Sequence, residues 1–207
     1  MDGFYVTVYD APLHPEESAK REVFVDSTYR RGANGTKPNM VSVFESAYGQ
    51  IHPGGTLDSD SHNGIGGGSR AEAFQDITNV PAGGVSRHPG IFGWGQGYGH
   101  EEREQIVQAL SDHRPATAGT GNAPLSHFPD DGWANAEVMV DGSKQTIRIP
   151  YGHAYMVEGA GSEGVTLRNP WRRNWTPDEN PVAASFVMSW EDFGHYYGDV
   201  AIGGPYR

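Results

Sequence analysis

The sequence contains no cysteine. Disulfide bonds, zinc sites with cysteine ligands and catalysis by a thiol of this chain are therefore excluded. The same absence removes the usual indicator of a reducing or an oxidising compartment. Any thiol chemistry would need a cysteine from another segment or another chain.

Long apolar runs and an excess of positive charge are also missing. No stretch approaches the roughly 18 apolar residues that cross a bilayer, and the opening MDGFYVTVYD lacks the basic-then-apolar order of a signal peptide. Lys and Arg total 15 against 26 Asp and Glu, giving a net charge of -11. No basic stripe offers phosphate contacts. We expect no membrane span and no nucleic-acid partner, and assign no localisation.

The residues that are abundant indicate a folded chain with long, turn-rich connections. Glycine (29) and proline (14) are plentiful among 207 residues, while aromatic residues make up 11%, more than disordered chains carry. The first strand-like run begins almost at residue 1, which suggests that a preceding segment has been removed.

The first half of the sequence combines two strands with helices. Alternating apolar residues predict an antiparallel pair of strands at 4–9 and 22–26. Helical spacing predicts helices at 41–50, 70–77 and 101–113. The first of these is expected to carry one apolar face, formed by Met40, Val43, Phe44, Ala47, Tyr48 and Ile51.

The second half is mostly β. Short apolar runs predict strands at 138–140, 146–149, 153–158, 165–169, 185–189 and 200–202, with a short helix at 190–197. The predicted class is α+β: an antiparallel β-rich lobe with two or three packed helices. We divide it into a helix-containing part, residues 1–115, and a β-rich lobe, residues 116–207.

One hairpin carries the candidate chemistry. The glycine-rich connection 159–164 joins two alternating runs, and centring it on Gly161 places His153 opposite Asn169. Directly opposed side chains lie close enough for an imidazole N–H to reach an amide oxygen. Such an amide orients a histidine that acts as general base. A polar cross-strand pair without catalytic function fits the same spacing.

The motifs in this hairpin, GHAYMV (152–157) and VTLRNPW (165–171), resemble those of the calpain family of papain-like cysteine proteases. The resemblance extends along the chain in the family's order. The other similar segments are FYVTVYDA (4–11), EVFVDSTY (22–29), FESAYGQIHPGG (44–55), GGSRAEAFQDITN (67–79), EREQIVQAL (102–110) and FVMSWEDFGHYYGDVAIG (186–203).

The resemblance implies a papain/calpain-like fold and limited cleavage of protein or peptide substrates through a thioester. It makes His153 the general base, Asn169 its orienting partner and Trp171 a shielding ring. The family's nucleophilic cysteine lies upstream of everything matched here, so this chain is expected to be inactive alone. The family's acidic calcium-binding segment is replaced by RRNWTPDEN, which makes calcium control doubtful.

Several readings of the missing cysteine stay open. The chain is a fragment of a longer protease, the partner of a cysteine-bearing segment or chain, or a pseudoenzyme. In the last case it serves as a binding or regulatory module, or as a processed effector or toxin piece. We predict no metal site and no cofactor: residues 58–64 match an EF-hand loop poorly, and the histidines lack ligand spacing.

Overall fold

The computed structural model describes residues 3–10, 19–30, 37–52, 68–90 and 97–205. The chain divides into two compact units, residues 1–82 and 83–207. Each unit is described by itself.

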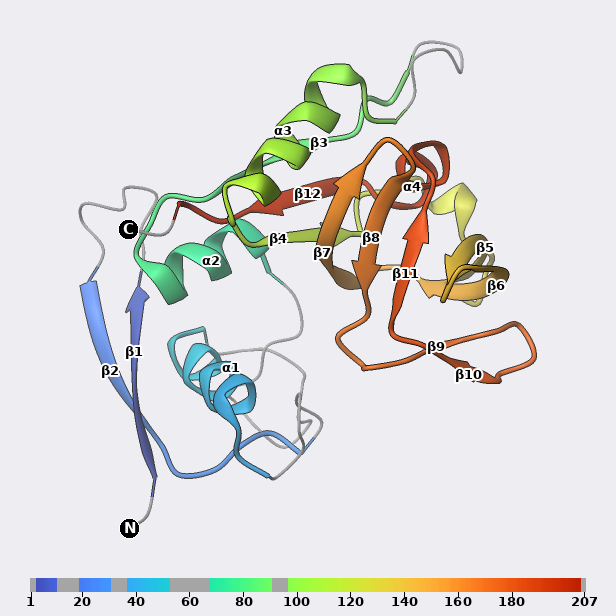
Figure 1. Ribbon diagram of the computed structural model, residues 1–207. Helices are drawn as coiled ribbons and strands as arrows, with labels where there is room; N and C mark the ends of the chain where they lie inside the picture. The colour runs from blue at the N-terminus through green and yellow to red at the C-terminus, as the bar shows by residue number, and fades with distance from the viewer. Residues whose placement is uncertain (1–2, 11–18, 31–36, 53–67, 91–96, 206–207) are drawn as a thin grey trace. The chain divides into compact units, whose positions relative to one another are not determined.

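The first unit packs two helices with a two-stranded antiparallel sheet. Strands β1 (Phe4–Asp10) and β2 (Ala19–Val25) pair along their whole length. Helices α1 (Met40–Ile51) and α2 (Arg70–Thr78) follow (Figure 1). The buried apolar cluster formed by the described residues is small: Val6, Val8, Val23, Val25, Val43 and Ala47.

Both helices begin at the caps that the sequence provides. The Asn39 side chain accepts from the Ser42 backbone N–H at 2.8 Å, and the Ser42 hydroxyl reaches back to the Asn39 N–H. Ser69 caps α2 by accepting from the Glu72 N–H. Of the apolar face expected for α1, Val43 and Ala47 are buried, whereas Met40, in the first turn, is 77% exposed.

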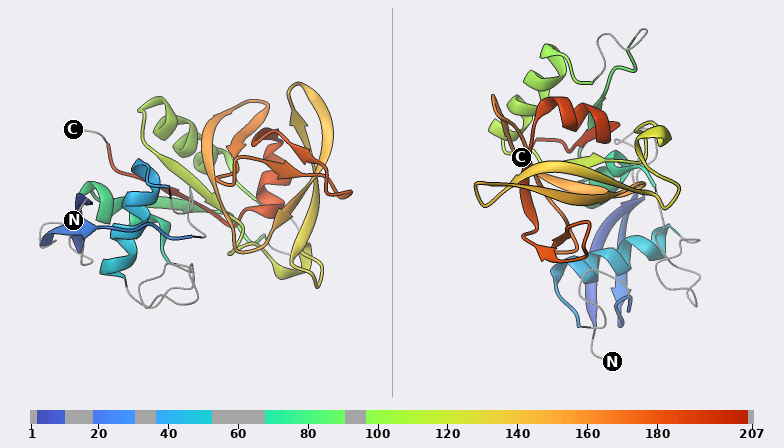
Figure 2. Two further views of the ribbon diagram at one scale, coloured as in Figure 1. Left: turned by 90° about the horizontal axis from the view of Figure 1, so that it is seen from below. Right: turned by 90° about the vertical axis from the view of Figure 1, so that its right-hand side faces the viewer.

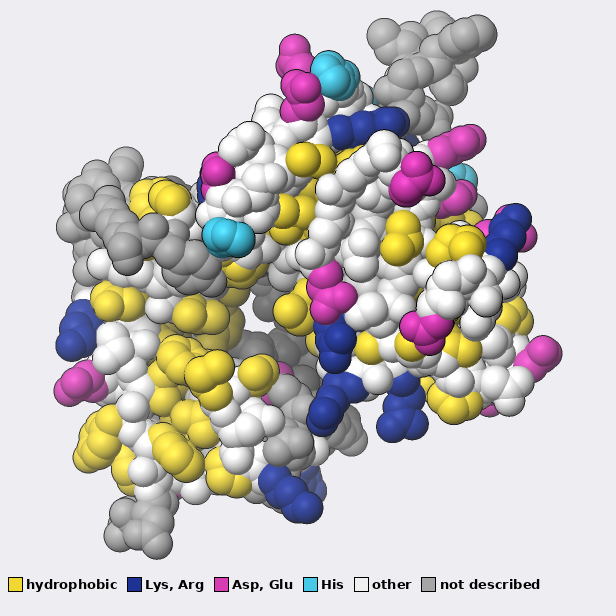
Figure 3. Space-filling model, in the orientation of Figure 1, with side chains coloured by type: hydrophobic (Ala, Val, Ile, Leu, Met, Phe, Trp, Pro, Cys, Tyr) yellow, Lys and Arg dark blue, Asp and Glu magenta, His cyan; other side chains and the backbone are white. Residues whose placement is uncertain are grey.

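An apolar groove lies on this unit. It measures about 460 Å³ and runs between the first residues of β1 and the first turn of α1. Tyr5, Phe4 and Val41 are exposed beside it. Figure 3 shows the apolar side chains gathered over β1 and α1. An exposed patch of this kind is typical of an interaction surface.

The second unit is built on one eight-stranded antiparallel sheet with the order β3-β12-β4-β7-β8-β11-β5-β6. Its strands are β3 (Gly83–Ser86), β4 (Ala116–Gly119), β5 (Trp133–Val140), β6 (Ser143–Pro150), β7 (Ala154–Gly161), β8 (Gly164–Arg168), β11 (Ser185–Met188) and β12 (Asp199–Ile202). A two-stranded ribbon, β9 (Asn174–Trp175) with β10 (Pro181–Val182), connects β8 to β11.

Helices cover one face of this sheet. Helix α3 (His100–Ser111) contacts β3, β4, β7 and β12, and α4 (Trp190–Tyr196) contacts β8. A short 3-10 helix, η2 (Leu125–His127), precedes β5. Figure 2 shows α3 and α4 on one side of the sheet and the β9–β10 ribbon on the other. The core of this unit contains the buried rings Tyr98, Tyr155, Phe186, Phe193 and Tyr197.

Two tight connections fix the hairpins. Asp141 and Gly142 both have positive φ, the backbone that the two-residue turn between β5 and β6 requires. Gly164, at the start of β8, has φ +138, and a Cβ there would run into the Met188 carbonyl. Only glycine fits that close approach of β8 to β11.

The predicted α+β class and the antiparallel sheet are confirmed. The sequence did not predict β3 and β4, which are short and rich in glycine and alanine, or the separate β9–β10 ribbon, whose strands are two residues long. The units divide at 82/83, whereas the predicted division is at 115/116. Strand β3 is an edge strand of the second unit's sheet, and helix α3 packs on that sheet. In the described part of the chain, no helix is long and apolar enough to cross a membrane.

Candidate functional site

His153 lies just before β7, where the backbone is held by the end of β4. The Thr120 hydroxyl accepts from the His153 backbone N–H at 2.9 Å and donates to the Pro150 carbonyl at 2.8 Å. The Thr120 backbone N–H donates to the His153 carbonyl. Thr120 is completely buried, so this small network fixes the position from which the imidazole projects.

The imidazole reaches the side chain of Asn169. His153 Nε2 and Asn169 Oδ1 are 3.1 Å apart. The Trp171 backbone N–H donates to the same oxygen at 3.0 Å. Two donors thus converge on one amide oxygen, and both mark that atom as the acceptor.

A second asparagine fixes this orientation from behind. The Asn169 amide nitrogen donates to Asn174 Oδ1 at 3.1 Å. The Asn174 nitrogen donates to the carbonyls of Ala183 and Ala184. Since carbonyls only accept, Asn174 must turn its oxygen toward Asn169, and Asn169 must turn its oxygen toward His153.

This chain of contacts determines the tautomer of the histidine. Nε2 carries the proton and donates to Asn169, so Nδ1 of the neutral ring keeps its lone pair. Asn169 is 1% exposed and Asn174 is fully buried, so water does not compete for these bonds. The arrangement can accept a proton at Nδ1.

Aromatic rings enclose the imidazole. The Trp171 ring stacks on His153 at 4.1 Å between centroids, and Tyr155 meets it edge-on at 4.9 Å. Tyr155 is fully buried, while Trp171 is 47% exposed and covers the solvent side. Burial raises the pKa of the Tyr155 phenol, which therefore stays protonated and is no competing base.

Burial lowers the pKa of His153 below its ordinary value of 6.5, and the hydrogen bond to Asn169 opposes this shift in part. The ring is consequently neutral at pH 7. A neutral, oriented imidazole with one free nitrogen is the state that a general base needs.

The predicted register of the hairpin is wrong, although the predicted neighbours meet. The turn is at Ser162–Glu163, and the pairing shifts at a bulge between Val157 and Gly159. Beyond the bulge Met156 pairs with Arg168, which places Asn169 across from Tyr155 rather than His153. His153 reaches Asn169 diagonally, within the range of long side chains.

A tryptophan-lined cavity of about 530 Å³ adjoins Trp171. Its other lining residues are Trp133, Arg148, Trp175 and Glu179. The Arg148 guanidinium lies over the Trp133 ring at 4.7 Å and is paired with Asp131 at 3.1 Å. An apolar wall with a few charged groups is typical of a peptide-binding surface.

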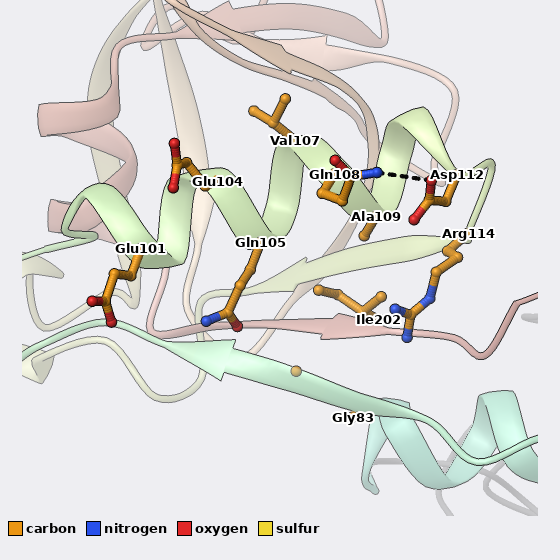
Figure 4. A pocket seen from close by; sticks show the side chains of 11 residues that line it. Gly83, Glu101, Glu104, Gln105, Val107, Gln108, Ala109, Asp112, Arg114 and Ile202 are labelled. Atoms are coloured by element: carbon orange, nitrogen blue, oxygen red, sulfur yellow. Dashed lines mark hydrogen bonds between the residues drawn. The ribbon is translucent and has the colours of Figure 1, made fainter.

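A larger cavity, about 830 Å³, lies along α3 and belongs to another part of the second unit. Figure 4 shows Glu101 and Gln105 pointing from α3 toward β3. It also shows the hydrogen bond that the Gln108 side-chain amide donates to Asp112. Arg114 donates to the Gly203 carbonyl there. None of the residues predicted for the site lines this cavity.

The structure therefore brings His153, Asn169 and Trp171 together, as the sequence predicts. Sequence reasoning missed Asn174, Thr120 and the partner tryptophans Trp133 and Trp175. The available signal for Asn174 was its position five residues after Asn169, in a segment interpreted only as a departure from a calcium site. Among the described residues, the second unit shows no group of three His, Asp or Glu ligand atoms.

Comparison of the sequence with known protein families and with curated proteins found no match in either case.

Proposed function

We propose that this chain carries the histidine–asparagine half of a calpain-like cysteine endopeptidase site, on a papain/calpain-like fold. The observation that supports the proposal best is the hydrogen-bonded series Asn174–Asn169–His153, in which both asparagines are buried. It leaves Nδ1 of a neutral imidazole as the proton acceptor. A polar pair of purely structural value would not need a second buried asparagine to select one tautomer.

In the proposed reaction, His153 Nδ1 takes the proton of a cysteine thiol, and the thiolate attacks the carbonyl carbon of the scissile peptide. The imidazolium then gives that proton to the departing amine, and a thioester remains. Water attacks the thioester after losing a proton to Nδ1, which releases the acid and returns the proton to sulfur. Asn169 accepts from Nε2–H throughout, and Trp171 covers that bond.

The thiol must come from outside this sequence, because the chain has no cysteine. A cysteine-bearing segment or partner chain would also supply donors to the developing oxyanion. The tryptophan-lined cavity beside Trp171 is suited to side chains of a protein or peptide substrate.

A second candidate function is a catalytically inactive binding module. The observation that favours it is the exposed apolar groove on the first unit, beside Tyr5 and Met40. Such a surface suits a partner protein whether or not a thiol is present.

The deciding experiment starts with the protein as it occurs in its source cells. Intact mass, N-terminal sequencing and copurification identify any cysteine-bearing segment or partner. The natural assembly is then treated with a peptidyl epoxide, which alkylates activated thiols, and assayed on an unfolded protein substrate.

The proposal predicts labelling of one cysteine and cleavage that falls at least about a hundredfold in His153→Ala, in line with the usual contribution of a general base. His127→Ala, a histidine of the same unit, is the matched control and should keep activity. A natural assembly without any cysteine, or a His153→Ala variant that cleaves at the normal rate, would leave the binding module.

A further inference from the structure

Three metal-ligating side chains converge in the first unit, which does not contain the histidine–asparagine pair. His52 follows α1 as its C-cap residue, and Glu72 and Asp76 lie one helical turn apart on α2. Their ligand atoms all lie within 4.8 Å of one another. Residues four apart share one helix face, so both carboxylates point to the same side of α2.

The cluster has a buried base and an accessible rim. Asp76 is fully buried, and its Oδ2 lies 2.5 Å from His52 Nε2. The His52 side chain is 30% exposed, and Glu72 is also partly exposed. A small ion can therefore reach the cluster from solvent while its innermost ligand stays dry.

Tyr48 packs against the imidazole of this cluster. Its ring centroid lies 4.3 Å from that of His52, one helical turn earlier in α1.

We propose that His52, Glu72 and Asp76 bind a divalent transition-metal ion of the zinc class, with water as the fourth ligand. One imidazole with two carboxylates suits zinc, whereas calcium and magnesium prefer oxygen ligands alone. Zinc takes nitrogen and oxygen ligands at about 2.0–2.2 Å, and tetrahedral neighbours then lie roughly 3.3 Å apart. His52 and Asp76 would have to part by less than about 1 Å to admit the ion.

The ion would join α1 to α2. The described apolar cluster of this unit has six buried residues, and so small a core gains much from an added cross-link. A ligand that binds only the folded state raises its stability by mass action. This metal site is independent of the proposed protease function, since none of its residues belongs to the second unit.

The test uses the full chain after treatment with a chelator, and zinc chloride alone as the probe. Calorimetric titration should show one equivalent bound, and the thermal unfolding temperature should rise with zinc. Cobalt(II), which reports coordination through its visible spectrum, should give the intense bands of a four-coordinate site.

Glu72→Gln and His52→Gln should each weaken binding by more than about tenfold, because loss of a ligand costs no less than loss of a supporting residue. Both positions are partly exposed, so these variants should fold. His100→Gln is the matched control: His100 pairs with Glu104 at i,i+4 on α3 and is 85% exposed. Equal binding by His52→Gln, or no zinc-dependent rise in stability, would make the cluster an ion pair between two helices.

Discussion

Asn174 holds the amide nitrogen of Asn169 at 3.1 Å, and Asn169 holds His153 Nε2 at the same distance. The contact between the two asparagines is buried, yet it decides that the amide oxygen of Asn169, and not its nitrogen, faces His153. The candidate site therefore depends on Asn174, which acts on His153 through Asn169.

Asn174→Ala should release the Asn169 side-chain amide and remove the Asn174 donor from the carbonyls of Ala183 and Ala184; the Ala184 carbonyl keeps only its bond from the Asn169 backbone N–H. Loss of buried partners costs about 1–3 kcal/mol, so urea unfolding should shift to lower concentration. The His153 ring should also become a mixture of tautomers, which nitrogen NMR resolves. Asn135→Ala, an exposed change on β5, should alter neither quantity; an unchanged tautomer in Asn174→Ala would contradict the proposed orientation.

The pH dependence of stability follows from the direction of the His153 shift. The folded pKa is lower than the ordinary value of 6.5, so the unfolded chain binds the proton more readily. The free energy of unfolding should therefore fall as pH decreases through 6.5 and level off below the folded pKa. Urea unfolding measured between about pH 8 and about pH 4 should show a smaller fall in the free energy of unfolding for His153→Gln than for the unaltered protein. His100→Gln, an exposed control, should follow the unaltered protein.

Trp171→Ala should remove the ring that covers His153 and let water reach the imidazole. Because burial is the largest cause of the lowered pKa, the pKa of His153 should rise toward its ordinary value. NMR titration of the ring protons measures this directly. Trp175→Ala is the control. Trp175 lines the same cavity, with its ring centroid 5.9 Å from that of Trp171. A larger pKa change in Trp175→Ala than in Trp171→Ala would refute the shielding role.

The glycines at the two ends of the β7–β8 turn should differ in how much an alanine substitution lowers stability. Gly164→Ala places a Cβ against the Met188 backbone at a φ of +138, and should cost at least about 2 kcal/mol. Gly161→Ala meets nothing within 4 Å and should change stability by less than about 0.5 kcal/mol. Denaturant unfolding of both variants checks this, and equal effects would mean that β8 and β11 are not so close.

The sequence predicts most helices and long strands because their apolar periodicity is strong. It fails where tertiary pairing rather than composition makes the strand, as in β4, whose residues Ala116–Gly119 have little β propensity. The hairpin register fails for a different reason. The turn lies at Ser162–Glu163 rather than at Gly161, and the bulge near Glu158 compensates only part of that displacement.

The sequence predicts the residues of the candidate site but not the buried residues that hold them in position. His153, Asn169 and Trp171 stand in recognisable order, whereas Asn174 and Thr120 act through buried hydrogen bonds between distant segments. The cluster of His52 with Glu72 and Asp76 was likewise missed, because its ligands come from two helices with no fixed spacing between them.

The bulge in β7 lies between two functionally different ends of the β7–β8 hairpin. His153 and Asn169 lie on one side of it, while the exposed tip at Ser162–Glu163 lies on the other. Residues added between Ser162 and Glu163 would lengthen the tip without changing the pairing of Met156 with Arg168. That tip is therefore a natural place to insert a purification tag or a fluorescent label while keeping the histidine in position.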